Sequence, residues 1–364
     1  MSTRPLLETA HGALPLPAFL PDATRAGVRC VEAEGVAQAG VRALMVNAYH
    51  VQTRPGVRVV QRLGGLHRFM GWDGPIATDS GGFQVLSLVR SDAKRGVVRP
   101  KGVLLRDPET GKRTWLTPEN TVRSQLDLGT DVVIALDDCT SPEMPVEEQR
   151  LSVERTERWF RAARSTFEQA VDVRVALDKR PLLVGVVQGG RDLELRRRCA
   201  ESILETGADA VGFGGWPVDA EGKLLVEAFD VLLELVPRAV PIFALGVGKP
   251  EHLVALCARR PGFVFDCTLP TRDARSHRLY AFEPGWPAAA LPCDDSFYGH
   301  VYILDDKHAR AEEPVEAGCD CACCTRYGRA YLHHMFKVKD PQAERLASIH
   351  NLRFYTRLVE RLAP

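Results

Sequence analysis

The chain has 364 residues, of which 45% are hydrophobic, and it carries 47 Lys or Arg residues against 47 Asp or Glu residues. This length suits a single α/β barrel with a sizeable core, and the balanced charge argues against a general basic coat for duplex DNA. Because no apolar run is long enough to cross a membrane and the first residues lack a signal-peptide pattern, we expect a cytoplasmic protein with no membrane partner.

Short apolar runs recur along the chain, and each ends in polar or glycine residues. Such runs, bounded by turn signals and containing β-branched residues, are typical of buried parallel strands. The eight runs are 17–23, 43–50, 75–82, 131–139, 183–190, 210–215, 242–248 and 263–270.

Helical patterns lie between most of these runs. The segment 116–129 has Thr117 as a candidate N-cap and Pro118 at the first helical position. Strands that alternate with helices over this length predict a single (β/α)8 barrel of the TIM type covering residues 1–364. Further helices are expected at 145–171, at 192–207 with Gly207 as its stop, and from Asp340 onward.

Polar residues and glycines stand at the carboxyl ends of the predicted strands. In a closed parallel barrel these ends share one face, which is where barrel enzymes perform their chemistry. Any one of these residues could simply end a strand, but their convergence on one rim favours a functional site. The residues are Asn47, Asp79, Asp137, Gln188, Gly214, Gly215 and Asp266.

The ten cysteines are unevenly distributed, because four of them lie within residues 319–324. A secreted disulfide framework would be shorter and more evenly spaced, so we interpret the cluster as a metal site in a reduced protein. Three thiolates and one imidazole complete the shell of a structural zinc and leave no position for a catalytic water. The predicted ligands of this Zn²⁺ are Cys319, Cys321, Cys324 and His350.

Other ligand choices stay open from the sequence. Cys323 could replace Cys321 or Cys324, and His333 or His334 could replace the chosen histidine. We expect the cluster to lie in a small zinc-binding subdomain of roughly 284–351, inserted before the last helix. Eight Lys or Arg against four Asp or Glu in 319–361 form a local basic patch, for which the alternative is a solvated helix face.

Several motifs occur in a characteristic order: DSGGFQV, VVQGG, GVGKP, FDCTLPTRDAR, and CDCACCTRYGRAYLHH with IHNLRFY. Together with NAYHVQTRPG and LGGLHRFMGWDGPIATDSGG, they resemble the bacterial-type tRNA-guanine transglycosylases of the queuine tRNA-ribosyltransferase family over nearly the whole chain. The resemblance implies a pentosyltransferase that exchanges guanine at the wobble position of a tRNA anticodon for a 7-deazaguanine in queuosine biosynthesis. It also implies a homodimer, which we expect to involve Tyr327, Tyr331 and His334.

The implied reaction exchanges one base for another with retained configuration at the ribose C1′. Two displacements need a covalent intermediate on a carboxylate, as in retaining glycosidases. By its position in FDCTLPTR, Asp266 is the implied nucleophile, and Asp79 in TDSGGF is the implied general acid and base. The structural alternative is that Asp79 caps a turn and Asp266 caps a helix.

A flat purine needs two apolar faces and edge-on hydrogen bonds. The resemblance places Phe83 on one face and Leu245, where the family usually has Met, on the other. It implies that Asp137, Gln188 and the Gly215 backbone form hydrogen bonds with the edge of the purine. The full implied base-binding set is Asp79, Ser80, Gly81, Gly82, Phe83, Asp137, Cys139, Gln188, Gly214, Gly215 and Leu245.

RNA contacts are expected beside the nucleophile, because a base in a loop must be splayed out before its C1′ is reachable. The glycine-rich GVGK segment offers backbone N–H groups and one ammonium, and TRDAR offers two arginines for phosphates or neighbouring bases. For these arginines the alternative is ion pairing within the protein. The implied tRNA-binding residues are Gly246, Val247, Gly248, Lys249, Thr271, Arg272, Asp273, Ala274 and Arg275.

One loop departs from the family pattern. After GFGG the family usually continues Leu-(Ala or Ser)-x-Gly-Glu, whereas this chain has Trp216 and Pro217. The loop is expected to contact the substituent that distinguishes incoming bases, so a bulky Trp and a rigid Pro would reshape the pocket. Cys139 and Val218 favour the small 7-aminomethyl-7-deazaguanine, and queuine salvage stays open.

Three other functions compete with this interpretation. A non-catalytic tRNA-binding paralogue would be free to lose Asp79, Asp266 and Gln188, all of which are present. A zinc hydrolase would need an open metal site at strand ends, whereas the cysteine cluster lies beyond the predicted barrel. The same chemistry on DNA is disfavoured only weakly by the neutral charge.

Overall fold

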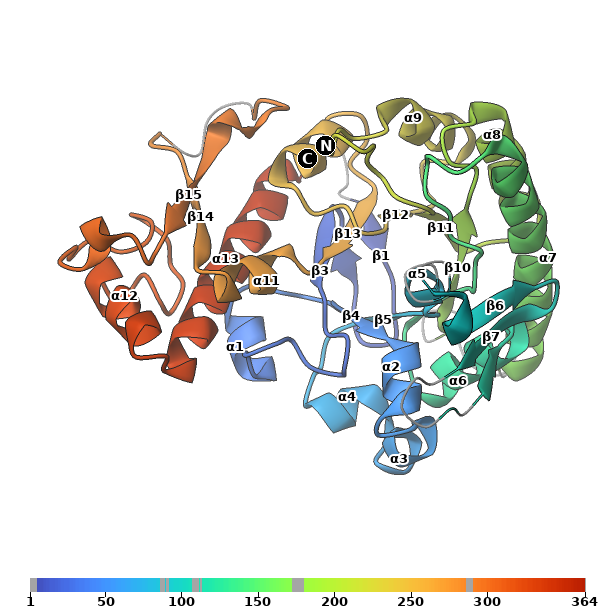
Figure 1. Ribbon diagram of the computed structural model, residues 1–364, viewed down its shortest axis with the longest axis horizontal. Helices are drawn as coiled ribbons and strands as arrows, with labels where there is room; N and C mark the ends of the chain where they lie inside the picture. The colour runs from blue at the N-terminus through green and yellow to red at the C-terminus, as the bar shows by residue number, and fades with distance from the viewer. Residues whose placement is uncertain are drawn as a thin grey trace.

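A ring of eight parallel strands forms the centre of the molecule (Figure 1). The computed structural model describes residues 5–85, 89, 92–106, 111, 113–171, 180–285 and 291–363. The strands are hydrogen-bonded in the order β3-β13-β12-β11-β10-β9-β5-β4. They are β3 (Ala18–Pro21), β4 (Leu44–Asn47), β5 (Ile76–Asp79), β9 (Val132–Ile134), β10 (Leu182–Val187), β11 (Ala210–Phe213), β12 (Ile242–Ala244) and β13 (Phe263–Cys267).

The two ends of this sheet meet and nearly close the barrel. Asp22, just after β3, forms a parallel bridge with Met45 of β4, and the Ala23 N–H donates to the Met45 carbonyl at 2.7 Å. Each of the eight apolar runs overlaps one of the eight strands, so the predicted (β/α)8 architecture is confirmed.

Helices follow most strands and cover the outside of the ring (Figure 1). The predicted cap of α6 is present, because Thr117 Oγ1 accepts the Asn120 N–H at 3.3 Å and Pro118 begins the helix. The helices of this part are α1 (Ala33–Gln38), α2 (Ala48–Thr53), α3 (Val57–Arg62), α4 (Gly65–Met70), α5 (Gly82–Val85), α6 (Pro118–Asp127), α7 (Val146–Ala170), α8 (Leu193–Glu205), α9 (Val226–Leu235), α10 (Pro250–Cys257) and α11 (Leu269–Arg275).

The interior of the barrel is filled by apolar side chains. Met45, Ile134, Val186 and Phe243 belong to one buried cluster that also contains Leu14 from a short hairpin, β1 (Leu6–Leu7) with β2 (Leu14–Pro15). His11 of this hairpin contacts Asp131, which directly precedes β9. The hairpin therefore covers the amino-terminal end of the barrel and leaves the carboxyl end for a site.

A three-stranded antiparallel sheet lies between β5 and α6, and the sequence patterns did not predict it. Its strands are only four or five residues long: β6 (Gly96–Arg99), β7 (Gly102–Arg106) and β8 (Arg113–Leu116). Buried residues of this sheet pack with Leu136 and Trp159 in a separate apolar cluster.

The C-terminal elements stand to one side of the barrel (Figure 1). They are the hairpin of β14 (Arg278–Phe282) and β15 (Tyr298–Tyr302), α12 (Arg329–Lys337) and the long α13 (Pro341–Leu362). Of the predicted zinc-binding subdomain, residues 286–290 lie outside the described residues. Of the helices that the structure describes, none combines the length and the apolar character of a membrane span.

Candidate active site and metal centre

A cavity of about 570 Å³ opens at the carboxyl ends of the barrel strands. Of the predicted site residues, Gly81, Gln188, Thr271, Asp273, Ala274 and Arg275 do not line it. The predicted residues that line the cavity are Asp79, Ser80, Gly82, Phe83, Asp137, Cys139, Gly214, Gly215, Leu245, Gly246, Val247, Gly248, Lys249, Asp266 and Arg272.

Asp79 is the last residue of β5, and its carboxylate is fixed by two neighbours. Its Oδ1 accepts the Gly81 N–H at 2.9 Å, and its Oδ2 accepts from Asn47 Nδ2 at 2.9 Å. Burial, together with the charge of Asp266, raises the pKa of Asp79 to about 7 against the opposing effect of these two hydrogen bonds. A carboxyl group that titrates near neutrality can both give and take a proton.

Asp266 lies in β13, three strands away from β5 around the ring. Its Oδ1 accepts the Gly246 N–H at 3.1 Å, which leaves Oδ2 without a partner among the described residues. Burial raises the pKa of Asp266 to about 7. The two aspartates thus line one cavity, and the charge of Asp266 contributes to the raised pKa of Asp79.

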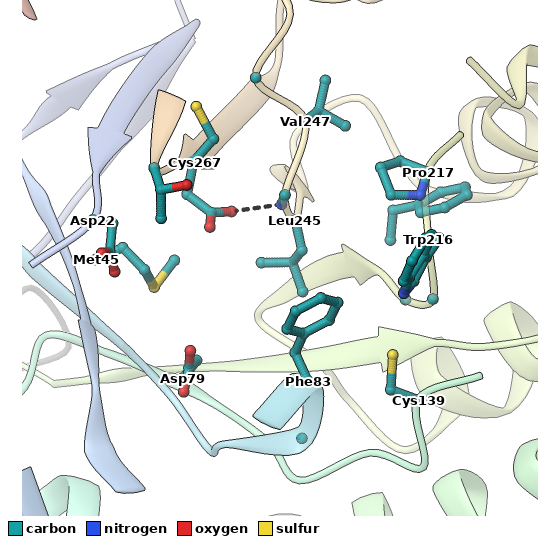
Figure 2. A pocket seen from close by; sticks show the side chains of 18 of the residues that line it. Asp22, Met45, Asp79, Phe83, Cys139, Trp216, Pro217, Leu245, Val247 and Cys267 are labelled. Carbon is teal, nitrogen blue, oxygen red and sulfur yellow. Dashed lines mark hydrogen bonds between the residues drawn. The ribbon is translucent and has the colours of Figure 1, made fainter. Parts of the chain in front are cut away.

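Phe83 and Leu245 form an apolar pair inside the cavity. Figure 2 shows the Leu245 side chain pointing toward the Phe83 ring. Asp79 lies on one side of this pair, and Cys139 and Trp216 lie on the other (Figure 2). Phe83 is 53% exposed, so one face of its ring is accessible to a flat ligand.

Asp137 is held by Gln188. The Gln188 Nε2 donates to Asp137 Oδ2 at 2.6 Å, and Gln188 itself has no exposed surface. Burial raises the pKa of Asp137 to about 7, although this hydrogen bond lowers it. Gln188 therefore acts on the cavity through Asp137 in this structure, rather than by lining it as predicted.

Arg196 was not predicted from the sequence. It hydrogen-bonds to the backbone of the two glycine-containing turns at the rim of the barrel. It has no exposed surface, and its guanidinium donates to the carbonyls of Val187, Gly190 and Gly214 at 2.9–3.4 Å. It also lies 4.1 Å above the Phe213 ring. Burial lowers the pKa of Arg196 to about 10.

Other lining residues were also missed. Asp22 adds a third carboxylate to the cavity, and the hydroxyl of Thr24 donates to it at 2.5 Å. Burial raises the pKa of Asp22. Asp22 lies near the carboxyl end of the first predicted strand, as Asp79 does in the third, so its position was a usable signal.

The predicted tRNA-binding segment of α11 is half turned inward. Thr271, Asp273 and Ala274 are buried, and Asp273 accepts from Arg278 Nη2 at 2.6 Å. Only Arg272, with a side chain 54% exposed, lines the cavity. The buried members can support the shape of this helix but do not present side chains to an RNA strand.

Three cysteines and one histidine converge beside α13. The Nδ1 atom of His350 lies 3.8, 3.7 and 3.2 Å from the Sγ atoms of Cys319, Cys321 and Cys324, and all four ligand atoms lie within 4.8 Å of one another. These separations suit ligands around one tetrahedral metal ion.

The outer nitrogen of the same imidazole is also fixed. The Nε2 of His350 lies 2.6 Å from the Tyr280 carbonyl, so it carries the hydrogen and directs the Nδ1 lone pair toward the sulfur atoms. Cys323 is buried but is not part of the cluster. The described residues thus contain a Cys3His cluster that fits a structural metal.

Known proteins resemble this chain over nearly its whole length. The family model described as "Queuine tRNA-ribosyltransferase" matches residues 4–363. The chain belongs to the queuine tRNA-ribosyltransferase family. Members of this family are pentosyltransferases, so the cavity of this family member is a candidate active site.

Individual relatives agree with this assignment. A queuine tRNA-ribosyltransferase of Syntrophobacter fumaroxidans is 36% identical over 97% of this chain and 87% of its own length. Relatives of the same name from Psychrobacter sp. and Herpetosiphon aurantiacus are 34% and 35% identical, over 96% and 97% of this chain and 86% and 82% of their own lengths.

Proposed function

We propose that the chain is a tRNA-guanine transglycosylase that replaces guanine at the anticodon wobble position with a 7-deazaguanine, preferentially 7-aminomethyl-7-deazaguanine, in queuosine biosynthesis. The observation that carries this proposal is that Asp79 and Asp266 line one cavity and that the charge of Asp266 raises the pKa of Asp79. Retaining exchange at a sugar carbon needs such a pair, one nucleophile and one proton carrier.

The two carboxylates divide the chemistry between them. In the first displacement an oxygen of Asp266 bonds to the ribose C1′, the C1′–N9 bond breaks, and guanine leaves with the electron pair and a proton from Asp79. In the second, N9 of the deazaguanine bonds to C1′, the ester bond to Asp266 breaks, and Asp79 recovers a proton from the incoming base. Both Asp residues end as they began.

The rest of the cavity suits a flat purine. Phe83 and Leu245 contact its two faces, and Asp137 accepts from its ring N–H and exocyclic amine. The substituent at position 7 then extends toward Cys139 and Trp216, on the side of the apolar pair away from Asp79 (Figure 2). This orientation brings the base's N9 toward the catalytic pair.

Zinc is the proposed occupant of the Cys3His cluster, because thiolate and imidazole ligands in a closed tetrahedral set are typical of structural zinc. It would hold Cys319, Cys321, Cys324 and His350 together and take no part in the base exchange. The stacked rings of Tyr327 and Tyr331, 4.4 Å apart, belong to the proposed homodimer contact. Static light scattering at micromolar concentration tests that contact, and a monomer would contradict it.

Incorporation of radiolabelled guanine into tRNA tests the proposed activity. We expect incorporation by the wild-type protein and a loss of about 10²–10⁴-fold in Asp79→Asn, the usual range for removing a general acid. Asp266→Asn should give neither exchange nor a denaturation-resistant protein–RNA adduct. A zinc-loaded wild-type protein that incorporates no guanine into any tRNA would instead support the non-catalytic paralogue.

The preferred incoming base needs a separate experiment. Guanine, 7-aminomethyl-7-deazaguanine and queuine compete for one anticodon stem-loop, and the product ratio measures the preference. We expect the aminomethyl base to prevail, because Cys139 and Val218 border the cavity beside Trp216. A preference for queuine would assign the chain to queuine salvage.

A further inference from the structure

The antiparallel sheet of β6, β7 and β8 is strongly basic in a chain with no net charge. Residues 92–116 contain seven Lys or Arg against three Asp or Glu. Six of these cations are described and all are exposed, and we call them together with their three strands the basic sheet. They are Lys94, Arg95, Arg99, Lys101, Arg106 and Arg113.

Several partly buried arginines elsewhere in the protein are paired with carboxylates. In the basic patch predicted at 319–361, Arg353 pairs with Asp320 at 2.6 Å and with Glu360 at 2.9 Å. On the barrel helices, Arg197 pairs with Glu234 at 2.6 Å. Similar pairs involve Arg329, Arg345 and Arg357.

The basic sheet differs from these surfaces. Within the described part of the chain, only one of its cations has an ion pair, between Arg95 and Asp92 at 3.7 Å. Arg106 and Arg113 are direct partners in the β7–β8 register, which places like charges opposite each other. Such a pair destabilises a sheet, so the arrangement indicates an anionic partner that compensates for the repulsion.

An aromatic ring accompanies the cations. The Lys101 ammonium lies 4.2 Å from the centroid of the Trp115 ring, and Trp115 is only partly buried. Surfaces that combine cations with an accessible aromatic ring are typical of proteins that bind single-stranded or looped nucleic acid, because the cations contact phosphates and the ring stacks on a base.

The inner face of the basic sheet is attached beside the cavity. Leu105 and Leu116 pack in one cluster with Leu136, which directly precedes Asp137, and with Tyr49, which follows β4. The turn between β6 and β7 is fixed by Trp159, whose Nε1 donates to the Pro100 carbonyl at 2.8 Å. The cations are therefore held on a packed support at the carboxyl side of the barrel.

We propose that the basic sheet binds the phosphate backbone of the same RNA whose target nucleotide enters the cavity. The inference rests on the proposed function for the identity of that RNA. Each engaged cation replaces condensed counterions on a phosphate, so the sheet contributes affinity and salt dependence but no sequence preference.

The test compares RNA binding by two fourfold variants with the wild type, using fluorescence anisotropy of a labelled anticodon stem-loop over a range of salt concentrations. The sheet variant combines Arg99→Gln, Lys101→Gln, Arg106→Gln and Arg113→Gln. The control variant replaces four exposed arginines outside the sheet and the cavity: Arg42→Gln, Arg62→Gln, Arg68→Gln and Arg238→Gln.

For the sheet variant we expect an at least tenfold weaker Kd at about 0.1 M salt and a slope of log K against log salt that is smaller by about 3, since each phosphate contact contributes roughly 0.7–0.9. The control variant should match the wild type. In guanine exchange, the KM for RNA should rise more than kcat falls. Unchanged Kd and slope in the sheet variant, or equal losses in both variants, would overturn the proposal.

A single substitution of Arg113 separates loss of RNA binding from loss of stability. Arg113→Gln removes the repulsion with Arg106, so we expect a lower RNA affinity without a lower melting temperature. A variant that loses affinity only to the extent that its melting temperature falls would overturn the proposal. Arg113→Lys should restore affinity. Direct binding also separates the two proposals, since RNA binding through the sheet without guanine exchange would contradict only the proposed function.

Discussion

The side-chain amide of Gln188 donates a 2.6 Å hydrogen bond to the carboxylate of Asp137. Gln188 is fully buried; its Oε1 accepts from the Thr140 hydroxyl at 3.5 Å, and its backbone N–H donates to the sulfur of Cys199. The amide therefore fixes one of the two carboxylate oxygens of Asp137. Because burial raises the pKa of Asp137 to about 7, the free energy of unfolding depends on pH through the ionisation of this carboxyl group.

Asp137→Asn should stabilise the free protein at alkaline pH while it weakens base binding. The folded pKa of Asp137 is about 7 against 3.8 in a model peptide, so the folded state binds more protons and wild-type stability falls as pH rises from about 4 to 7. An asparagine at this position does not ionise, so the variant does not lose this stability as pH rises. Urea unfolding at pH 5 and pH 8 should show a larger gain for the variant at pH 8, on the order of a few kcal/mol.

Asp131 is a suitable control, because its pKa is shifted in the opposite direction to that of Asp137. Burial opposes its ionisation, but hydrogen bonds from His67 and His11 and from the Ile76 N–H lower the pKa of Asp131 overall. The ionised Asp131 therefore stabilises the fold at neutral pH, and this stabilisation is lost as pH falls below 3.8, the pKa of an unperturbed aspartate. Asp131→Asn should therefore destabilise the protein at pH 8. The same shift in both variants would contradict the electrostatic explanation.

The pH dependence of guanine exchange should be bell-shaped around neutrality. The nucleophile must be ionised, so the rate falls as Asp266 is protonated below its pKa of about 7. The acid must be protonated, so the rate also falls above the pKa of Asp79, about 7 as well. Because the two groups interact, the two apparent pKa values of the profile describe the pair of aspartates and not the individual residues. A flat profile of kcat/KM between pH 5.5 and 8.5 would contradict this assignment.

Arg196→Lys should weaken base binding although Arg196 lies outside the cavity. A lysine cannot reproduce the planar set of donors to the Val187, Gly190 and Gly214 carbonyls, so the two glycine turns should loosen by about 1–3 kcal/mol. We expect the KM for guanine to rise about tenfold. The matched control is Arg198→Lys on the same helix, where Arg198 is 47% exposed and pairs with Glu157; similar effects of both changes would sink the explanation.

Metal content distinguishes the cluster from its spare cysteine. We expect one zinc per wild-type chain by elemental analysis, none after Cys324→Ser, and one after Cys323→Ser, because the Sγ of Cys324 but not of Cys323 joins His350. Chelation should lower the melting temperature of the wild type and the Cys323 variant alike. Zinc retained by Cys324→Ser would show that the ligand set is wrong.

The barrel and the metal ligands were predictable because their signals are local. Apolar runs ending in polar residues predicted all eight strands, and cysteine spacing with His350 predicted the Cys3His cluster that the structure brings together. The roles assigned to Asp79 and Asp266 stay predictions, and the structure adds that both line one cavity.

What the sequence left out depends on tertiary contacts. Arg196 lies in a run of three arginines, which is typical of a solvated helix face, yet it is fully buried beneath the rim. The strands of the basic sheet are too short for a period of two to emerge from the pattern. Gln188 was expected to line the cavity, and only the folded structure reveals that it contacts Asp137 instead.

Helix α13 carries His350 and, five residues further on, Tyr355, whose hydroxyl donates to the Gly248 carbonyl at 2.7 Å. Gly248 is itself a lining residue of the cavity. One rigid rod thus spans from the cysteine cluster to the mouth of the barrel. If an RNA orders this mouth through α13, thermodynamic reciprocity requires the RNA and the bound ion to strengthen each other's equilibrium binding by the same factor.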